Sequence, residues 1–227
     1  MSKPKLAKFA EMKTFPNVLQ NFSHYHPALV DQNGKIRDLK GNWNSDYFQN
    51  GNPIVLELGC GKGDYTVELA MEFPEKNFIG VDLKGSRIWT GAKRALELEL
   101  GNAAFIRARI ELLDRFFSKN EISEIWITFP DPYPKRSKAN KRLTSAFFLE
   151  RYRQLCRPNA VVHLKTDNAA LFEFSVEVAS QSPDKIMKVV ENVYSKGKPT
   201  DELAIQTYYE KMHLEEGRTI RYLQFKL

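Results

Sequence analysis

The stretch IVLELGCGKG, residues 54–63, decides the fold. A mostly apolar run at 54–58 leads directly into three glycines, each separated from the next by a single residue, and a helix-compatible segment follows from Asp64. A buried strand that ends in a glycine turn and continues into a helix is the first half of a strand–helix–strand unit. We therefore expect an α/β domain that covers residues 51–227.

Strand-like and helix-like segments alternate along the rest of this domain. Further strands are expected at 77–82, 103–106, 125–129, 160–164, 186–194 and 219–226, and helices near 84–100, 111–117, 144–156 and 169–179. This alternation predicts a mostly parallel, seven-stranded sheet with helices on both faces. Because no clear helix separates the last two strands, they are expected to form an antiparallel hairpin at the edge.

Residues 1–50 show no sustained hydrophobic period. Turn formers such as Asn33-Gly34 are scattered among lysines and aromatic residues, and only Lys5–Phe9 favours a helical turn. We interpret this segment as an N-terminal extension that is partly flexible.

Composition limits the classes of function. The net charge of +6 and the pI near 9.2 weakly favour an anionic partner. The two cysteines have neither disulfide-framework nor zinc-site spacing, and no signal peptide or apolar run of about 18 residues is present. These features predict a cytoplasmic protein without a membrane span. The four histidines show no metal-ligand spacing, so no metal is expected.

The glycine turn and an acid indicate a nucleotide pocket. Ligands of open α/β sheets bind beyond the carboxyl ends of the strands, where Gly59, Gly61 and Gly63 allow close approach. Asp82 ends the second strand of the domain, where its carboxylate can accept hydrogen bonds from both ribose hydroxyls. The spacing differs from the dinucleotide fingerprint, although an NAD site and a turn without any ligand remain alternatives. The pattern that begins at Glu57 resembles the S-adenosylmethionine site of Rossmann-like methyltransferases, which implies that Glu57 faces the amino-acid portion of that cofactor.

A second stretch, FPDPYPKRSKANKRL (residues 129–143), follows an apolar strand. Its three prolines stiffen the loop and hold Asp131 in a set position. Five of the eight residues from 135 to 142 are cationic, which suits contact with phosphates. A solvated surface loop is the plain alternative for these charges. A DPPY-type motif, which serves methylation of amino groups, is an alternative for the acid and Tyr133.

Four motifs follow one another along the chain: FPDPYPK (129–135), NKRL (140–143), KTDN (165–168) and TYYE (207–210). Together, and in this order, they resemble the tRNA (guanine-N7-)-methyltransferase family. The resemblance implies transfer of a methyl group from S-adenosyl-L-methionine to N7 of guanine 46 in the variable loop of tRNA. It also implies that Thr207 and Glu210 contact the substrate.

The chemistry of guanine explains why an acid is needed. N7 already carries a lone pair, so alignment with the methyl group can supply most of the catalysis, whereas a carboxylate can select guanine through its N1–H and N2–H₂ donors and stabilise the developing positive charge. Asp131 is the first candidate for this catalytic and substrate-binding role. Asp167 is the second, with capping of the following helix as its alternative role. Lys135 is expected to bind a phosphate or to steady Asp131.

The remaining contacts are assigned by position. Arg136, Lys138, Lys141 and Arg142 are expected to bind RNA. Where the family usually carries an acidic or amide residue near the adenine, this chain has Arg109. Either backbone groups around Arg109 and Ile110 hold the adenine, or Glu111 reaches back to it. The sequence leaves open a monomer or a homodimer. A methyltransferase with another substrate, and a module that only binds RNA, are the alternative functions.

Overall fold

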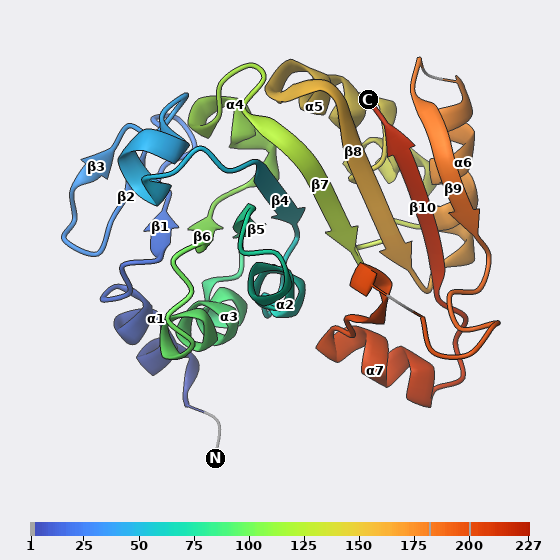
Figure 1. The fold of residues 1–227 in the computed structure, drawn as a ribbon, viewed down its shortest axis with the longest axis horizontal. Helices are drawn as coiled ribbons and strands as arrows, with labels where there is room; N and C mark the ends of the chain where they lie inside the picture. Colours follow the sequence, from blue (N-terminus) through green and yellow to red (C-terminus); the bar gives the residue numbers. More distant parts are fainter. Residues whose placement is uncertain (1–2, 182, 200) are drawn as a thin grey trace.

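The computed structural model describes residues 3–181, 183–199 and 201–227, and the described residues form one sheet of ten strands (Figure 1). The first two residues of the expected extension lie outside this description. The strand order is β3-β2-β1-β6-β5-β4-β7-β8-β10-β9. The seven strands expected from the sequence are β4 (Ile54–Leu58), β5 (Asn77–Asp82), β6 (Ala103–Arg107), β7 (Ile122–Thr128), β8 (Cys156–Thr166), β9 (Lys185–Val190) and β10 (Arg221–Lys226).

The directions of these strands confirm the expected class of fold. Strands β6, β5, β4, β7 and β8 pair with one another in parallel. Strand β10 lies between β8 and β9 and is antiparallel to both. The fold is therefore a Rossmann-like, mostly parallel sheet that ends in antiparallel strands. The last two strands do not form the expected hairpin, because η4 (Asp201–Ala204) and α7 (Tyr208–Glu215) lie between them in the chain.

The expected count of seven strands was too low, because the N-terminal segment adds three strands at the other edge. Strand β1 (Val18–Gln20) pairs in parallel with β6, and β2 (Leu29–Val30) and β3 (Ile36–Arg37) continue the sheet in antiparallel pairs. Each of these strands has only two or three residues, which is too short to establish an alternating pattern in the sequence. Their pairing with β6 is a long-range contact that local patterns do not reveal.

Other parts of the N-terminal segment also pack on the domain. Helix α1 (Lys5–Met12) lies against helix α3 (Gly85–Glu97), and Met12 is buried there. The buried Asn17 amide donates to the Ala92 carbonyl at 2.9 Å. A short helix, η1 (Trp43–Phe48), buries its tryptophan, and the indole donates to the Phe116 carbonyl at 2.9 Å.

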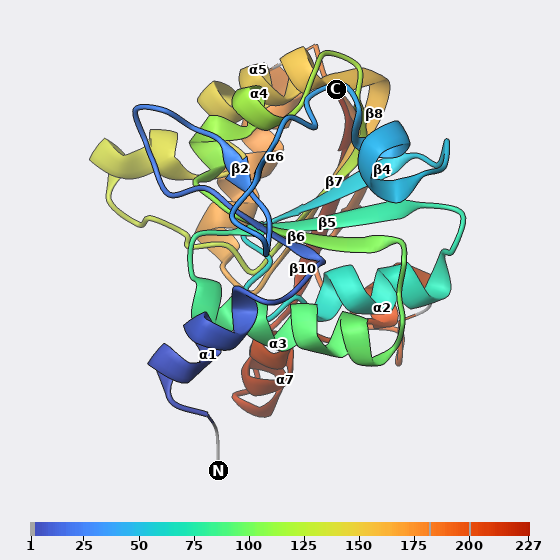
Figure 2. The same cartoon turned by 90° about the vertical axis from the view of Figure 1, so that its left-hand side faces the viewer.

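Helices cover both faces of the sheet, as Figure 2 shows from the side. Apolar residues of one face pack against α4, α5 and α6, and those of the other face pack against α1, α2 and α3. Neighbouring residues Val55 and Leu56 of β4 belong to opposite cores, as expected for the two-residue period of a strand. The other helices are α2 (Asp64–Glu72), α4 (Leu113–Phe116), α5 (Ala146–Leu155), α6 (Ala169–Gln181), α7 (Tyr208–Glu215), η2 (Ile110–Leu112), η3 (Arg136–Lys141) and η4 (Asp201–Ala204).

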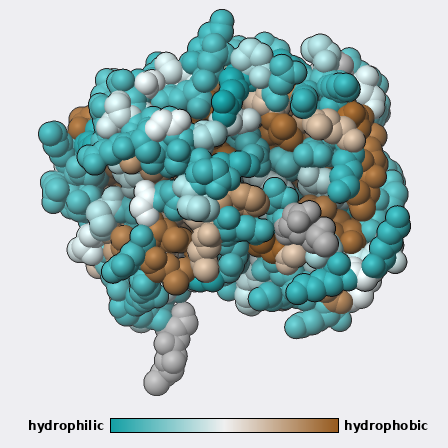
Figure 3. Space-filling view, in the orientation of Figure 1, coloured by the Kyte–Doolittle hydropathy of each residue, from teal (hydrophilic) through white to brown (hydrophobic). Residues whose placement is uncertain are grey.

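Strand β9 forms one open edge of the sheet. Met187 and Val189 are about half exposed there, at 48% and 45%. Hydrophobic residues gather over this strand at the right-hand margin of Figure 3, on a face that is otherwise mostly hydrophilic. Lys185 and Lys188 lie on the same strand, and charged side chains of this kind discourage pairing with another sheet edge.

The order of the strands reverses between β4 and β7. From β4 the chain continues to β5 and β6 on one side, and later to β7 and β8 on the other. Ligands of open α/β sheets bind beyond the carboxyl ends of the strands at such a reversal. The glycine turn after β4 and the proline-rich loop after β7 both lie at this point.

Two glycines allow the start of α2 to pack closely on α3. A Cβ atom at Gly91 would lie 2.6 Å from the Lys62 carbonyl oxygen and 2.9 Å from the Cα of Gly63. Gly63 has a φ of +74°, and a Cβ atom there would lie 2.7 Å from the Phe105 ring. Gly63 is thus required for its backbone conformation and for packing.

We predict that Gly91→Ala lowers the free energy of unfolding by about 1–3 kcal/mol, because the added methyl group overpacks this contact. Chemical denaturation measures the effect. Gly101→Ala is the matched control, since a Cβ atom there meets nothing within 4 Å and the backbone is not left-handed. Equal denaturation midpoints for the two variants would contradict the packing role of Gly91.

Candidate active site

A cleft opens where the strand order reverses. Its walls come from the glycine turn, from the ends of β5, β6 and β7, and from the proline-rich loop. The lining residues are Gly59, Asp82, Leu83, Lys84, Arg87, Ala108, Arg109, Ile110, Glu111, Phe129, Pro130, Asp131, Tyr133, Lys141, Leu143 and Phe148. The fold therefore places both sequence motifs on one cavity.

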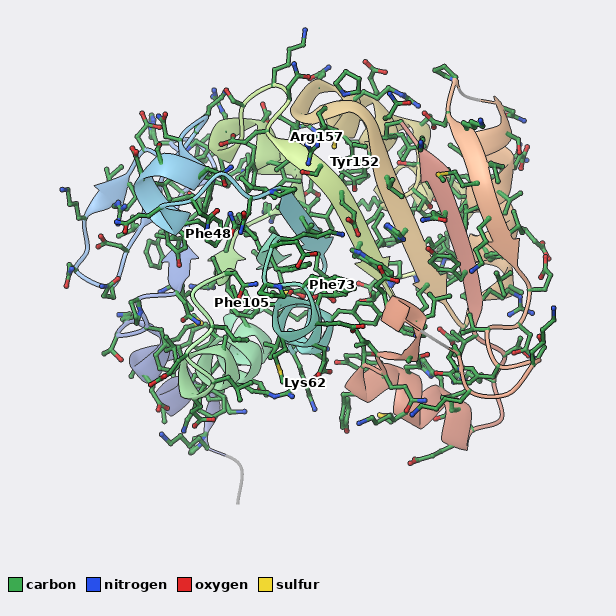
Figure 4. The ribbon with its side chains drawn as sticks, in the orientation of Figure 1. Phe48, Lys62, Phe73, Phe105, Tyr152 and Arg157 are labelled. Atoms are coloured by element: carbon green, nitrogen blue, oxygen red, sulfur yellow. The ribbon has the colours of Figure 1, made fainter. Side chains whose placement is uncertain are left out.

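The glycine turn has a left-handed backbone at each glycine. The φ angles are +76° at Gly59, +55° at Gly61 and +74° at Gly63, a region that other residues rarely adopt. The amides of Gly59 and Cys60 both donate to the Val81 carbonyl, at 2.8 and 3.1 Å. Lys62, labelled in Figure 4, lies in the same turn beside the start of α2.

Asp82 links the glycine turn to the next loop. One carboxylate oxygen accepts from the Gly61 amide at 2.9 Å, and the other accepts from the Lys84 amide at 2.7 Å. Each oxygen keeps a further lone pair for a ligand, because a carboxylate can accept about four hydrogen bonds. Asp82 therefore lines the cleft in a fixed orientation, with acceptor capacity left for the hydroxyls of a ribose.

Glu57 is buried beneath the glycine turn. One carboxylate oxygen accepts from the Thr66 amide at 2.8 Å and from the Thr66 hydroxyl at 2.5 Å, and the other accepts from the Thr128 hydroxyl at 2.9 Å. Burial is the main cause that raises the pKa of Glu57 to about 7, and these hydrogen bonds act against it. In this structure Glu57 joins β4 to α2 and β7, whereas the family resemblance implied contact with the cofactor.

Arg109 and Ile110 lie on the wall that follows β6, as does Glu111. The Arg109 side chain is exposed, and the Glu111 carbonyl accepts a hydrogen bond from Arg151. The backbone around Arg109 and Ile110 and the Glu111 residue therefore lie on the same wall of the cleft. Both expected ways of holding an adenine stay open.

The loop that carries Asp131 is held in an unusual conformation. Phe129 and Tyr133 flank it with φ angles of +48° and +42°. The Arg142 guanidinium donates to the carbonyls of Pro132 and Tyr133 at 3.1 and 3.2 Å. Asp131 is exposed on the cleft, and among the described residues its carboxylate has no hydrogen bond or ion pair. The loop thus presents a carboxylate that is available to a ligand.

Partial burial, followed by the negative charges of Asp131 and Glu111, raises the pKa of the nearby Tyr133. Cations also line the cleft, among them Arg87 and Lys141. The cavity therefore carries charges of both signs.

The cations of residues 135–142, which we call the basic loop, are in two different environments. Lys135, Arg136 and Lys138 are exposed, and Lys141 is exposed at the rim of the cleft. Arg142 is only partly exposed, because it braces the loop carbonyls and stacks over the Phe174 ring at 4.3 Å. The structure therefore gives Arg142 a supporting contact that the sequence did not predict.

Asp167 is engaged by residues near the C-terminus. Its carboxylate accepts from Arg218 at 2.8 Å and lies 3.6 Å from the His213 ring nitrogen. The alternative role in helix capping falls to its neighbour, since the Asn168 side chain accepts from the Leu171 amide at 2.8 Å.

Thr207 and Glu210 are both buried. The Thr207 hydroxyl caps α7 by accepting from the Glu210 amide at 3.0 Å. One Glu210 oxygen lies 2.7 Å from the Lys165 ammonium and accepts from the Tyr194 hydroxyl at 2.8 Å. Burial raises the pKa of Glu210 and lowers that of Lys165, while the charge of each partner opposes the shift in the other.

Three features of the site were missed from the sequence. They are the helix α7, the buried Lys165 and the bracing role of Arg142. The Thr-x-x-Glu spacing at 207–210 is a helix-start signal that could have identified α7. The partners of Lys165 are distant in sequence, so local patterns could not have identified them.

The cleft fits the expected cofactor, S-adenosyl-L-methionine. A Cβ atom added to Gly59 or Gly61 would meet no atom closer than 3.8 Å, so the left-handed turn leaves space beside its backbone. Asp82 supplies carboxylate oxygens at the same place. Within the described part of the chain, no cluster of three metal-binding side chains occurs, and no helix is long and apolar enough to cross a bilayer.

Comparisons with known proteins give one family. The sequence model of a family described as "Putative methyltransferase" matches residues 51–223. Proteins named tRNA (guanine-N(7)-)-methyltransferase from Bacteroides fragilis and Christiangramia forsetii are 46% and 44% identical over 227 residues. These alignments cover the whole of this chain and 87% and 99% of the two relatives.

Solved structures share the fold at low sequence identity. The crystal structure of the 16S rRNA methyltransferase KamB matches with a TM-score of 0.63 at 14% identity, covering 85% of this chain and 96% of that one. A structure of an antibiotic-related methyltransferase matches with a TM-score of 0.59 at 20% identity and the same coverage.

We predict that the stability of the protein depends on pH through Glu57. The pKa of Glu57 is about 7 in the folded state and near 4.5 in the unfolded state, so the unfolded state loses the proton at a lower pH. The free energy of unfolding therefore falls as pH rises between these two values. Glu57→Gln keeps an acceptor for Thr66 and removes the buried charge. Relative to this variant, the wild type should lose up to about 3 kcal/mol in free energy of unfolding from pH 4.5 to pH 7. Denaturation curves that give a constant difference across this range would contradict the assignment.

Proposed function

The chain belongs to the tRNA (guanine-N(7)-)-methyltransferase family, and from this premise we propose that it uses S-adenosyl-L-methionine to methylate guanine 46 in the variable loop. The protein is an enzyme that transfers a methyl group to N7 of a guanine in tRNA. The observation that carries the finer proposal is that the glycine turn, Asp82 and Asp131 line one cleft.

The chain's own residues account for cofactor binding in this proposal. Gly59 and Gly61 give the ligand close access to the backbone, and Asp82 accepts from the ribose hydroxyls. The wall at Arg109 and Ile110 holds the adenine. S-adenosyl-L-methionine, when bound, supplies an electrophilic methyl group on a sulfonium.

Asp131 is the proposed catalytic residue. Guanine N7 needs no general base, so the enzyme has to orient the base and stabilise the positive charge that it gains. The free carboxylate of Asp131 can accept from N1–H and N2–H₂, a pair of donors that adenine lacks. It can do so without breaking any contact among the described residues.

The other acids have weaker claims to direct contact with the base. Asp167 is paired with Arg218, and Glu210 is buried against Lys165. A cation therefore already offsets the charge of each acid, which weakens its attraction for a base that becomes positively charged. In our proposal these acids and Thr207 support the substrate side from outside the residues that line the cleft.

The exposed cations beside the cleft account for tRNA binding in the proposal. Lys135, Arg136, Lys138 and Lys141 lie in the loop and short helix that follow Asp131. Phosphate contacts there would orient the variable loop without reading sequence, while Asp131 selects the base. Residence in the cytoplasm, and a monomeric or homodimeric state, remain predictions.

We predict that Asp131→Ala lowers kcat by about 10²–10³-fold, the range found when a single charge-stabilising group is removed. Cofactor binding should survive, because Asp131 does not belong to the glycine turn. The assay uses unmodified tRNA and methyl-labelled S-adenosyl-L-methionine, with nucleoside analysis of the product. Label in 7-methylguanosine, and its loss when guanine 46 is replaced by adenine, would place the reaction at N7 of that guanine.

Asp38→Asn is the control for this test, because Asp38 is exposed just after β3, at the opposite edge of the sheet from β9. It should methylate at the wild-type rate. Label in another nucleoside would overturn the guanine-selecting role of Asp131. If Asp131→Ala loses cofactor binding, Asp131 would be assigned to the cofactor and not to the base.

We also predict that the affinity for tRNA falls steeply with salt. Each phosphate contact removed, for example by Lys138→Gln or Lys141→Gln, should reduce the slope of log K against log salt by about 0.7–0.9. Filter binding at several salt concentrations measures this slope. Lys188→Gln, on the distant edge strand β9, is the control and should leave the slope unchanged. The same slope in all variants would exclude the basic loop from the tRNA interface.

A further inference from the structure

The ammonium of Lys165 is buried among four oxygen atoms. Its side chain is fully buried, and the nitrogen lies 2.7 Å from a Glu210 carboxylate oxygen. It also lies 2.9 Å from the Leu203 carbonyl, 3.0 Å from the Ile205 carbonyl and 3.2 Å from the Tyr65 hydroxyl. Burial of an ammonium is unfavourable unless its hydrogen-bonding capacity is met, and here it is met in full.

Three of these four oxygens belong to one stretch near the C-terminus. We call residues 202–210 the cover segment. A cation in this place can join separate stretches of main chain, whereas an apolar residue would give only packing. Lys165, which lies on β8 between β7 and β10, therefore attaches the cover segment to the sheet.

The cover segment is also attached to the start of α2. The Tyr65 hydroxyl donates to the Glu202 carbonyl at 2.8 Å, and the Tyr208 amide donates to the Asp64 carboxylate at 2.8 Å. The Lys62 ammonium lies 3.1 Å from the centre of the Tyr208 ring. Figure 1 shows the result, with α7 lying across the carboxyl ends of β7 and β8, near α2.

Helix α7 begins in the cover segment and touches both ends of the cleft. The Tyr209 ring lies 3.8 Å from the position of a Cβ atom on Gly61 and 5.4 Å from the guanidinium of Arg87, which lines the cofactor side. The His213 ring lies 5.7 Å from that of Phe129, two residues before Asp131. Helix α7 therefore contacts the cleft both on the side of the glycine turn, where the cofactor would bind, and on the side of Asp131, where the base would bind.

Lys165 also holds the loop of Asp131 through its main chain. The Phe129 amide donates to the Lys165 carbonyl at 2.8 Å, which extends the pairing of β7 with β8. One residue thus fixes a wall of the cleft, the loop of Asp131, by its carbonyl oxygen, and the cover segment by its ammonium.

We propose that Lys165 is a positioning residue for methyl transfer. It holds the cover segment in a fixed position relative to Asp131. This inference rests on the proposed function. Lys165 does not touch the reacting atoms. Its loss would let the cover segment shift, and a shift of about 1 Å in aligned reactants can lower the rate about 10²-fold.

Lys165→Met tests this role, because methionine has a similar length and no charge. We expect kcat to fall about 10–100-fold while KM for tRNA changes little, because the phosphate contacts lie elsewhere. Hydrogen exchange should quicken in residues 202–215 and stay slow in β4 and β5. Lys165→Arg keeps the cation and should regain part of the turnover.

Tyr65→Phe is a milder variant, which keeps the charge and removes one attachment of the cover segment. We expect a smaller fall in kcat, little change in KM for tRNA, and faster hydrogen exchange in residues 202–215. This variant replaces Lys165→Met as the test if that variant fails to fold. Lys188→Met, which removes an exposed lysine from β9, is the matched control and should behave as the wild type.

The outcomes separate this inference from the proposed function. If the wild type makes no 7-methylguanosine, the proposed function fails whatever the variants do. If the wild type makes it and both Lys165→Met and Tyr65→Phe keep its kcat, the positioning role alone fails. A loss of activity that only follows the unfolded fraction, with wild-type exchange in residues 202–215, would also overturn the positioning role.

Discussion

The buried carboxylate of Glu57 is the contact on which the geometry of the cleft depends. It lies at the end of the central strand β4 and accepts three hydrogen bonds, two from Thr66 in α2 and one from Thr128 in β7. The glycine turn lies between Glu57 and Thr66 in the sequence, so these bonds fix both of its ends. Burial raises the pKa of this acid, so its placement costs free energy at neutral pH. Burial of this acid therefore lowers the free energy of unfolding at neutral pH, while its hydrogen bonds fix the conformation of the glycine turn.

The first turn of α2 is held from two sides by charges of opposite sign. Thr66 binds Glu57 from β4, and its neighbour Tyr65 binds Lys165 from β8. Asp64, which precedes them, accepts from the cover segment. The start of one helix therefore connects the glycine turn, the sheet and the cover segment. A parallel sheet makes this possible, because the carboxyl ends of its strands converge on the same edge.

The sequence predicted the parts of the molecule that local patterns specify. Apolar runs such as 54–58 identified the central strands, and the glycines identified the turn, because a left-handed backbone restricts the choice of residue. The strands of the N-terminal segment were missed, since strands of two or three residues depend on pairing with β6. The environment of Lys165 was also missed, because its partners lie between 38 and 100 residues away in the sequence.

Burial and pairing distinguish Asp131 from three other acids that the sequence analysis assigned to the site. Glu57, Asp167 and Glu210 each have a hydrogen-bond or ion-pair partner, whereas Asp131 is exposed on the cleft with no such partner among the described residues. An acid that is buried or paired with a cation attracts a positively charged base less strongly than an unpaired, accessible one. Asp131 is unpaired among the described residues, and its loop is stiff and braced by Arg142. Of these four acids, only Asp131 has no hydrogen-bond or ion-pair partner among the described residues, which is why our proposal assigns the substrate to it.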